Sequence, residues 1–200
     1  VFTLVWLVSL AAAMVAPLGG AWLRLPGIRA ASEAVSLAID LLPPVLLVAT
    51  AVLLWARRRQ DSVAALLSLS FLMMAAAFFA AEGFFRAVEL GWVREAFAHG
   101  GRCLLMLVLL TFPDGRFSPR WSAWVAAGLL VWGPVAAFWP APRNLAYAGY
   151  LLFLALSVLS IAIPYRRLAG GLERQQVRWV LFGFAGGTLL LAIATLVSLL

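Results

Sequence analysis

The chain has 200 residues, of which 65% are hydrophobic, and its mean hydropathy is +1.03. Soluble domains are only about 45–50% apolar, so a water-soluble globule is excluded and a membrane protein is predicted. The net charge is +7, but every cation is an arginine beside an apolar run, which argues against a nucleic-acid-binding protein. Cys103 is the only cysteine, so intrachain disulfides and cysteine metal clusters are also excluded.

The apolar runs predict an all-α, polytopic transmembrane helix bundle of about seven spans, forming one domain over residues 1–200. The runs cover residues 2–18, 37–56, 63–81, 103–112, 121–139, 145–165 and 177–200. We expect Pro17 and Gly19-Gly20 to close the first helix, and Pro43-Pro44 to kink or start the second. Asp40, just before these prolines, would favour a helix N-terminus. The fourth run is short, so its helix is expected to begin near residue 97.

Arginine counts predict the orientation in the membrane. Loops after the second, fourth and sixth runs hold nine arginines, and loops after the first, third and fifth hold six. Three of those six share their loop with Glu82, Glu89 and Glu95. The positive-inside rule then puts the nine arginines and the N-terminus in the cytoplasm. Residue 200 would lie outside, so an eighth helix and a cytoplasmic output domain are expected beyond it.

A loop of distinctive sequence, Phe-Pro-Asp-Gly-Arg-Phe-Ser-Pro-Arg-Trp, joins the fourth and fifth runs. Pro113-Asp114-Gly115 is turn chemistry, because proline presets φ, aspartate bonds nearby backbone and glycine accepts a positive φ. Arg116 and Arg120 place two cations beside two membrane-length runs. The pattern predicts a short loop held at one membrane face.

A second cationic loop precedes the last run. It begins with Tyr165-Arg166-Arg167 and ends with Glu173-Arg174-Gln175-Gln176-Val177-Arg178-Trp179. Arg174 and Arg178 are four residues apart, on one helical face beside Trp179, as is typical of an interfacial anchor for anionic lipid. The alternative is a helix end that turns or slides when the bundle responds to a signal.

Together these two loops resemble the loops in the multi-span N-terminal region of bacterial sensor histidine kinases of the ComP type. In that group the first loop reads FPDGRF-x-PRW, and a later one reads Tyr-Arg-Arg followed by ERQQ-x-[KR]-W. The resemblance covers the second half of the chain, and it departs at residues 168–172, where a linker with serine and proline is commoner. It implies a membrane sensor region of the bacterial inner membrane. The implied partners are lipid, a second copy of the chain, and a downstream kinase module or response regulator.

The one dense group of charges lies between the third and fourth runs. Glu82, Arg86 and Glu89 have the spacing of ion pairs on one helical face, and Arg94, Glu95, His99 and Arg102 follow. One interpretation is an exposed outer loop whose charges pair with each other. The other is an external ligand-binding site formed by Glu82, Arg86, Glu89, His99 and Arg102, because ionisable residues at membrane depth are often functional. His99 beside Gly100-Gly101 is expected in a loop and is a poor metal ligand alone.

Three functions remain open from the sequence. The first is a multi-span sensory domain that relays a ligand or membrane signal to a cytoplasmic histidine kinase. The second is a non-catalytic accessory or scaffold subunit of a larger membrane complex, and the third is a transporter or channel. We find no catalytic motif in these residues, and we expect no metal, cofactor or nucleic-acid partner.

Overall fold

The computed structural model describes residues 2–28, 30–58, 60–112, 115–138 and 143–165. Every regular element in these ranges is a helix, which confirms the predicted all-α class. The elements are α1 (Phe2–Arg24), η1 (Leu25–Gly27), α2 (Ala31–Arg58), α3 (Ser62–Ala76), η2 (Phe79–Ala81), α4 (Glu82–Ala87), α5 (Gly91–Thr111), α6 (Ser122–Phe138) and α7 (Arg143–Tyr165). The predicted seventh run and the loop before it lie outside the described residues.

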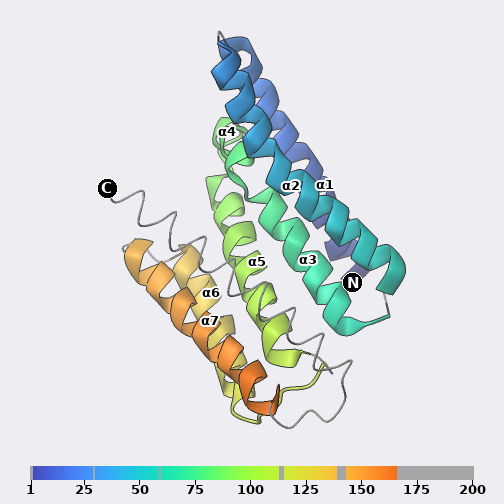
Figure 1. Cartoon of the computed structure of the whole chain (residues 1–200). Helices are drawn as coiled ribbons and strands as arrows, with labels where there is room; N and C mark the ends of the chain where they lie inside the picture. Colours follow the sequence, from blue (N-terminus) through green and yellow to red (C-terminus); the bar gives the residue numbers. More distant parts are fainter. Residues whose placement is uncertain (1, 29, 59, 113–114, 139–142, 166–200) are drawn as a thin grey trace.

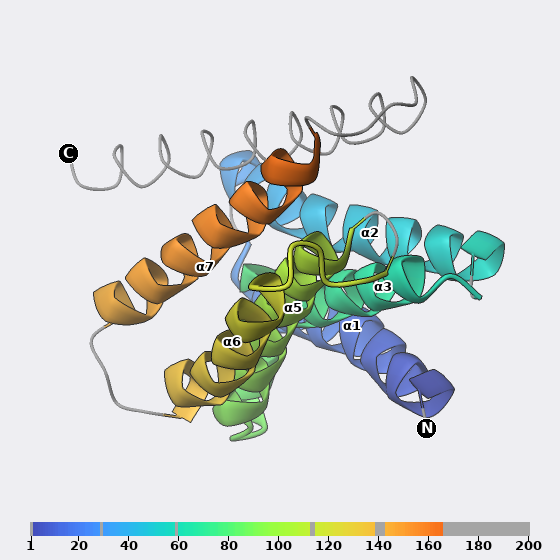
Figure 2. The same ribbon diagram turned by 90° about the horizontal axis from the view of Figure 1, so that it is seen from below.

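The helices form two groups that meet at the centre of the molecule. Helices α1, α2 and α3 pack together as the N-terminal group, and α5, α6 and α7 pack together as the C-terminal group. Helices α3 and α5 pack against each other and join the groups, while α4 packs on α1 (Figure 1). Seen from below in Figure 2, α6 and α7 lie on one side of α5, and α1 to α3 lie on the other.

The connections alternate between two ends of the molecule (Figure 1). The α2–α3 turn, the α5–α6 loop and the last turn of α7 lie at one end, here called the Arg57 end. The α1–α2 turn, α4 and the first turns of α5 and α7 lie at the other, here called the Glu82 end. A Cβ built on Gly115 of the α5–α6 loop would lie only 3.2 Å from Ser62 Oγ at the start of α3. The loops after the second and fourth predicted spans therefore touch.

Helix α1 does not end where its sequence predicts. It continues through Pro17 and Gly19-Gly20 to Arg24, so the expected stop was wrong. A proline inside an apolar helix removes one backbone hydrogen bond without ending the helix when neighbouring helices pack around it. Gly20 has a packing role, because a Cβ there would lie 1.8 Å from the carbonyl oxygen of Ala80 in η2.

Helix α2 likewise passes through Pro43 and Pro44, beginning at Ala31 and ending at Arg58. Asp40 consequently lies inside the helix, in its third turn, and does not start it. Its carboxylate pairs instead with Arg24 at the end of α1, with Arg24 Nη1 2.8 Å from Asp40 Oδ2. The charge of Asp40 is thus used to hold α1 and α2 together.

The third predicted span is interrupted. Helix α3 stops at Ala76, and the η2–α4 segment continues at an angle of 49° to it. Arg24 Nη2 donates a hydrogen bond to the Phe79 carbonyl at this break, over 3.3 Å. Arg24 therefore joins three elements, α1, α2 and η2. No proline or glycine lies at the break itself, so no local pattern predicts it.

The N-terminal group has a core rich in small side chains. Its buried members are Trp6, Ala13, Ala51, Leu69, Leu72, Ala75 and Ala76. Two buried hydrogen bonds cross it, because Trp6 Nε1 donates to Ser68 Oγ and Ser68 Oγ donates to the Ala51 carbonyl, each over 2.8 Å. Helices α1, α2 and α3 are thus tied through one serine. Ser70 Oγ makes a similar bond of 2.8 Å to the Gly101 carbonyl and ties α3 to α5.

Two helices in the described ranges are long and apolar enough to cross a membrane, Phe2–Gly27 and Ala31–Arg58. The bent pair Ser62–Ala76 and Phe79–Ala87 makes a third if it is counted as one broken span. Only 28% of the most apolar 18 residues of the first segment and 17% of those of the second are buried inside the protein. Both helices therefore present apolar side chains outward, as expected of surfaces that face lipid.

Candidate functional site

The candidate site is a row of polar side chains that starts on α4 and continues along α5. Glu82 at the start of α4 pairs with Arg86 one turn later, with 2.5 Å between Arg86 Nη2 and Glu82 Oε1. Arg94 in the first turns of α5 lies 3.9 Å from the other Glu82 oxygen and 3.0 Å from Glu95 Oε1. The predicted pairing of Glu82 with Arg86 is therefore confirmed, and Arg94 extends it to α5.

Glu89 does not belong to this row of polar side chains. Helix α4 ends at Ala87, and Glu89 follows in a turn with a positive φ of 57° and an exposed side chain. The expectation that Glu82, Arg86 and Glu89 share one helical face was therefore wrong for Glu89. Its backbone conformation belongs to the turn that lets the chain enter α5.

At His99 the row of polar side chains enters the protein interior. The prediction of a loop histidine was wrong, because His99 lies in the middle of α5 and is buried. Its Nδ1 is 2.7 Å from the Tyr150 hydroxyl of α7, and the two atoms share a hydrogen bond. Its Nε2 is 3.6 Å from Glu95 Oε2, one turn earlier on α5. His99 thereby connects the charged end of α5 to α7.

Three residues of α5, namely His99, Arg102 and Cys103, lie around the Tyr150 side chain. The His99 ring stacks on it with 5.5 Å between centroids, and the Arg102 guanidinium lies 5.7 Å from its centroid, in cation–π range. Cys103 Sγ is 4.0 Å from the Tyr150 hydroxyl and 3.7 Å from the Leu129 carbonyl of α6. Helices α5, α6 and α7 thus meet at one polar centre.

The structure therefore groups some of the predicted site residues and adds others. We call this set the polar network, and its members are Glu82, Arg86, Arg94, Glu95, His99, Arg102, Cys103 and Tyr150. Tyr150 was missed in the sequence, although a hydroxyl in the middle of an apolar run needs a partner, and that was the available signal. Cys103 is buried, with 7% of it exposed, and it packs in the core of the C-terminal group.

The network offers charges and hydrogen-bond donors that can bind and position a polar group. Arg94 Nε is buried and has no hydrogen-bond partner among the described residues, so it offers a donor inside the network. Within the described ranges, no group of three or more histidine, cysteine or acidic side chains could hold a metal ion.

At the Arg57 end, Gly115 of the α5–α6 loop has the positive φ that its sequence predicts. Gly115 has φ = 69°, in the left-handed region that favours glycine. Arg116 and Arg120 are both exposed. Pro113 and Asp114 lie outside the described residues, as do Arg166, Arg167, Glu173, Arg174, Gln175, Gln176, Arg178 and Trp179.

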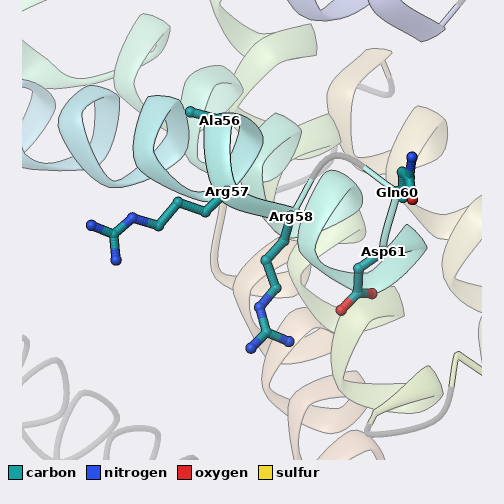
Figure 3. Close-up of a pocket in the computed structure, with 5 residues that line it drawn as sticks. All are labelled: Ala56, Arg57, Arg58, Gln60 and Asp61. Atoms are coloured by element: carbon teal, nitrogen blue, oxygen red, sulfur yellow. The ribbon is translucent and has the colours of Figure 1, made fainter.

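A hollow of about 380 Å³ opens beside this loop, at the α2–α3 turn. It is lined by Ala56, Arg57, Arg58, Gln60 and Asp61, and Figure 3 shows both arginine side chains extending away from α2. Asp61 caps α3, accepting hydrogen bonds from the amides of Val63 and Ala64 over 2.9 and 3.3 Å. The hollow was not predicted from the sequence.

No protein-family model matches this chain, and neither a curated protein nor a solved structure matches it.

Proposed function

We propose that this chain is a multi-pass sensory domain of about seven spans in the bacterial inner membrane, with its N-terminus in the cytoplasm. The domain relays a signal sensed at the Glu82 end to a cytoplasmic histidine kinase module, and it works as a homodimer. One observation carries the proposal. A single helix, α5, bears five of the eight members of the polar network and ends at the loop that contains Gly115 and Arg116.

The outward-facing surface supports membrane embedding. Large apolar side chains are exposed along α1, α2, α6 and α7, where a soluble protein would carry polar residues. Exposed aromatic residues flank these faces at both ends, as in the aromatic belts of membrane proteins. Trp22 and Trp92 lie at the Glu82 end and are 73% and 61% exposed, and Trp124 lies at the Arg57 end and is 81% exposed.

The charges of the described residues support the proposed orientation. Four arginines stand against one carboxylate at the Arg57 end, whereas four arginines stand against five carboxylates at the Glu82 end. The positive end is formed by Arg57, Arg58, Arg116 and Arg120 with Asp61, and the other end by Arg24, Arg86, Arg94 and Arg143 with Glu33, Asp40, Glu82, Glu89 and Glu95. The positive-inside rule favours the first set in the cytoplasm.

The polar network supports a sensing role because its members link three helices. A ligand that accepts a hydrogen bond from Arg94 or competes for Glu82 changes the balance of charges beside His99. It can shift the bundle only if it binds two arrangements of α5 and α7 with different affinity. Helix α5 then transmits the change in helix arrangement from the Glu82 end to the Arg57 end.

Orientation is tested with single cysteines in a Cys103→Ala background, at Glu89 and at Arg116. In right-side-out vesicles, a membrane-impermeant maleimide should label the Glu89→Cys variant directly. It should label the Arg116→Cys variant only after permeabilisation. Labelling of the Arg116→Cys variant from outside contradicts the proposed orientation.

Signalling is tested on the native, full-length gene product in membrane vesicles. We expect ATP-dependent phosphorylation that Glu82→Ala and Arg86→Ala change and that Glu33→Gln does not. Glu33 is a matched control because it lies at the same end, and glutamine preserves its hydrogen bond to the Ala30 amide. A product without kinase activity that co-purifies in a stoichiometric complex favours the accessory-subunit alternative. Equal activity in all variants removes the sensing role of this end.

A further inference from the structure

The hollow at the α2–α3 turn is part of a wider cationic surface. Arg57 and Arg58 occupy the last turn of α2, and both are exposed. A Cβ built on Gly115 would lie 3.2 Å from Ser62 Oγ, so the α5–α6 loop, with Arg116 and Arg120, passes close to the start of α3. Two loops that are far apart in sequence thus contribute four arginines to the same end of the molecule.

The one acidic group in the hollow, Asp61, caps α3 and leaves two arginines against one carboxylate. Asp61 directs Oδ1 at the first amides of α3, where the helix dipole stabilises a carboxylate. Neither Arg57 nor Arg58 forms an ion pair within the described part of the chain. Both guanidinium groups are therefore available to an anion of the surroundings.

Apolar surface continues directly from the cationic one. Along α2, Leu46, Val52 and Leu53 are exposed on the turns that precede Arg57. On α6, Trp124 is exposed just after Arg120. A ligand that matches both surfaces carries an anionic group joined to a hydrocarbon chain.

We propose that the hollow lined by Arg57, Arg58, Gln60 and Asp61 is a binding site for the phosphate headgroup of an anionic phospholipid, whose acyl chain lies along the exposed face of α2. Arginine binds phosphate oxygens through a planar pair of N–H donors, and Gln60 offers a further donor. The inference rests on the proposed membrane embedding and orientation, and it is independent of the kinase output.

The chain is reconstituted into nanodiscs of phosphatidylcholine with a minor fraction of phosphatidylglycerol, and the retained lipids are counted by native mass spectrometry. We expect phosphatidylglycerol to be retained above its bulk fraction. The Arg57→Gln/Arg58→Gln variant should lose this enrichment by about fivefold per arginine. Arg116→Gln/Arg120→Gln is the matched control, because it removes two exposed guanidinium groups at the same end that do not line the hollow, and it should change retention by less than about twofold.

Two further arms identify the ligand class and separate the two proposals. Nanodiscs of phosphatidylcholine alone are supplied with inorganic phosphate, and binding of phosphate at the same two arginines would show a general anion site and overturn the lipid assignment. Equal losses in the Arg57→Gln/Arg58→Gln and Arg116→Gln/Arg120→Gln variants would show bulk charge attraction and overturn the site. A chain that inserts with the proposed orientation but retains no phosphatidylglycerol refutes the lipid site alone. A chain that fails to insert refutes the proposed function as well.

Discussion

Helices α1, α2 and α3 are held together by close contacts between small side chains, by the Trp6–Ser68 hydrogen bond and by the Arg24–Asp40 ion pair. Helices α5 and α7 meet at a polar centre, where His99 and Tyr150 share a hydrogen bond. Small residues that pack closely leave the helix backbones little space to move relative to one another. A single hydrogen bond between two side chains can be broken and remade while the helices shift. We therefore expect the N-terminal group to be the less mobile part of the domain and α7 to be the element most easily displaced.

The largest expected effect is loss of packing in the N-terminal group. Leu72 is fully buried in its core, and Leu72→Ala should lower the free energy of unfolding by about 2–5 kcal/mol. The control Leu46→Ala removes an exposed leucine of α2 and should have a much smaller effect. Unfolding of the purified protein in detergent, followed by circular dichroism, measures both. Equal losses would contradict the assignment of Leu72 to a tightly packed core.

The close approach of α1 to η2 gives the second prediction. Gly20→Ala places a methyl group against the Ala80 carbonyl and should destabilise the protein by about 1–3 kcal/mol. Gly27→Ala is the matched control, since nothing lies within 4 Å of its added Cβ. If the two variants melt at the same temperature, the contact between Gly20 and Ala80 does not restrict the packing of α1.

Ser68 tests the hydrogen bonds inside the same group. Ser68→Ala removes the acceptor of the Trp6 indole and the donor to Ala51, and we expect a loss of about 1–2 kcal/mol because both partners stay buried. Ser36→Ala, at an exposed position on α2, serves as the control. The emission maximum of Trp6 would be followed in a variant in which the other tryptophans are phenylalanine. An unchanged maximum in Ser68→Ala speaks against the Trp6–Ser68 bond.

The C-terminal group should respond more weakly to the loss of its own bond. Tyr150→Phe keeps the ring and removes the hydroxyl, with an expected loss of about 0.6 kcal/mol, the average for interhelical hydrogen bonds in membranes. A double-mutant cycle with His99→Ala measures the coupling energy between the two side chains. A coupling near zero would mean that His99 and Tyr150 only pack. A coupling well above that of Ser68 with Trp6 would reverse the comparison between the two groups.

The smallest expected effect is at the surface. The Arg86 side chain is 79% exposed, so Arg86→Gln should cost only about 0.3 kcal/mol despite the ion pair with Glu82. Thermal unfolding in low and in high salt measures this contribution, and high salt should abolish the difference. A loss that persists in high salt would show that Arg86 holds α4 by a contact other than charge pairing.

The sequence predicts best the features that depend on near neighbours in the chain. The fifth apolar run, expected at residues 121–139, corresponds to α6 at Ser122–Phe138. The positive φ of Gly115 follows from the requirements of its turn, and the Glu82–Arg86 pair follows from helical spacing. The crossing of a membrane by all seven runs stays a prediction.

The sequence predicts poorly the features that depend on contacts between distant segments. The break after Ala76 is supported by Arg24, which lies more than 50 residues earlier, and by the space that Gly20 leaves on α1. Tyr150 meets His99 only because α7 packs on α5, and spacing along one helix cannot reveal that. The helix end predicted at Pro17 was wrong because the rule that proline ends helices describes chains in water, where freed carbonyls can bond to solvent.

The contact of Gly115 with Ser62 has a consequence for any protein that approaches the Arg57 end. The α2–α3 turn and the α5–α6 loop form a single epitope, although more than 50 residues of sequence separate them. A binder raised against either loop as an isolated peptide would miss half of its target. A binder selected on the folded domain would report, through its affinity alone, whether the two groups of helices are still docked.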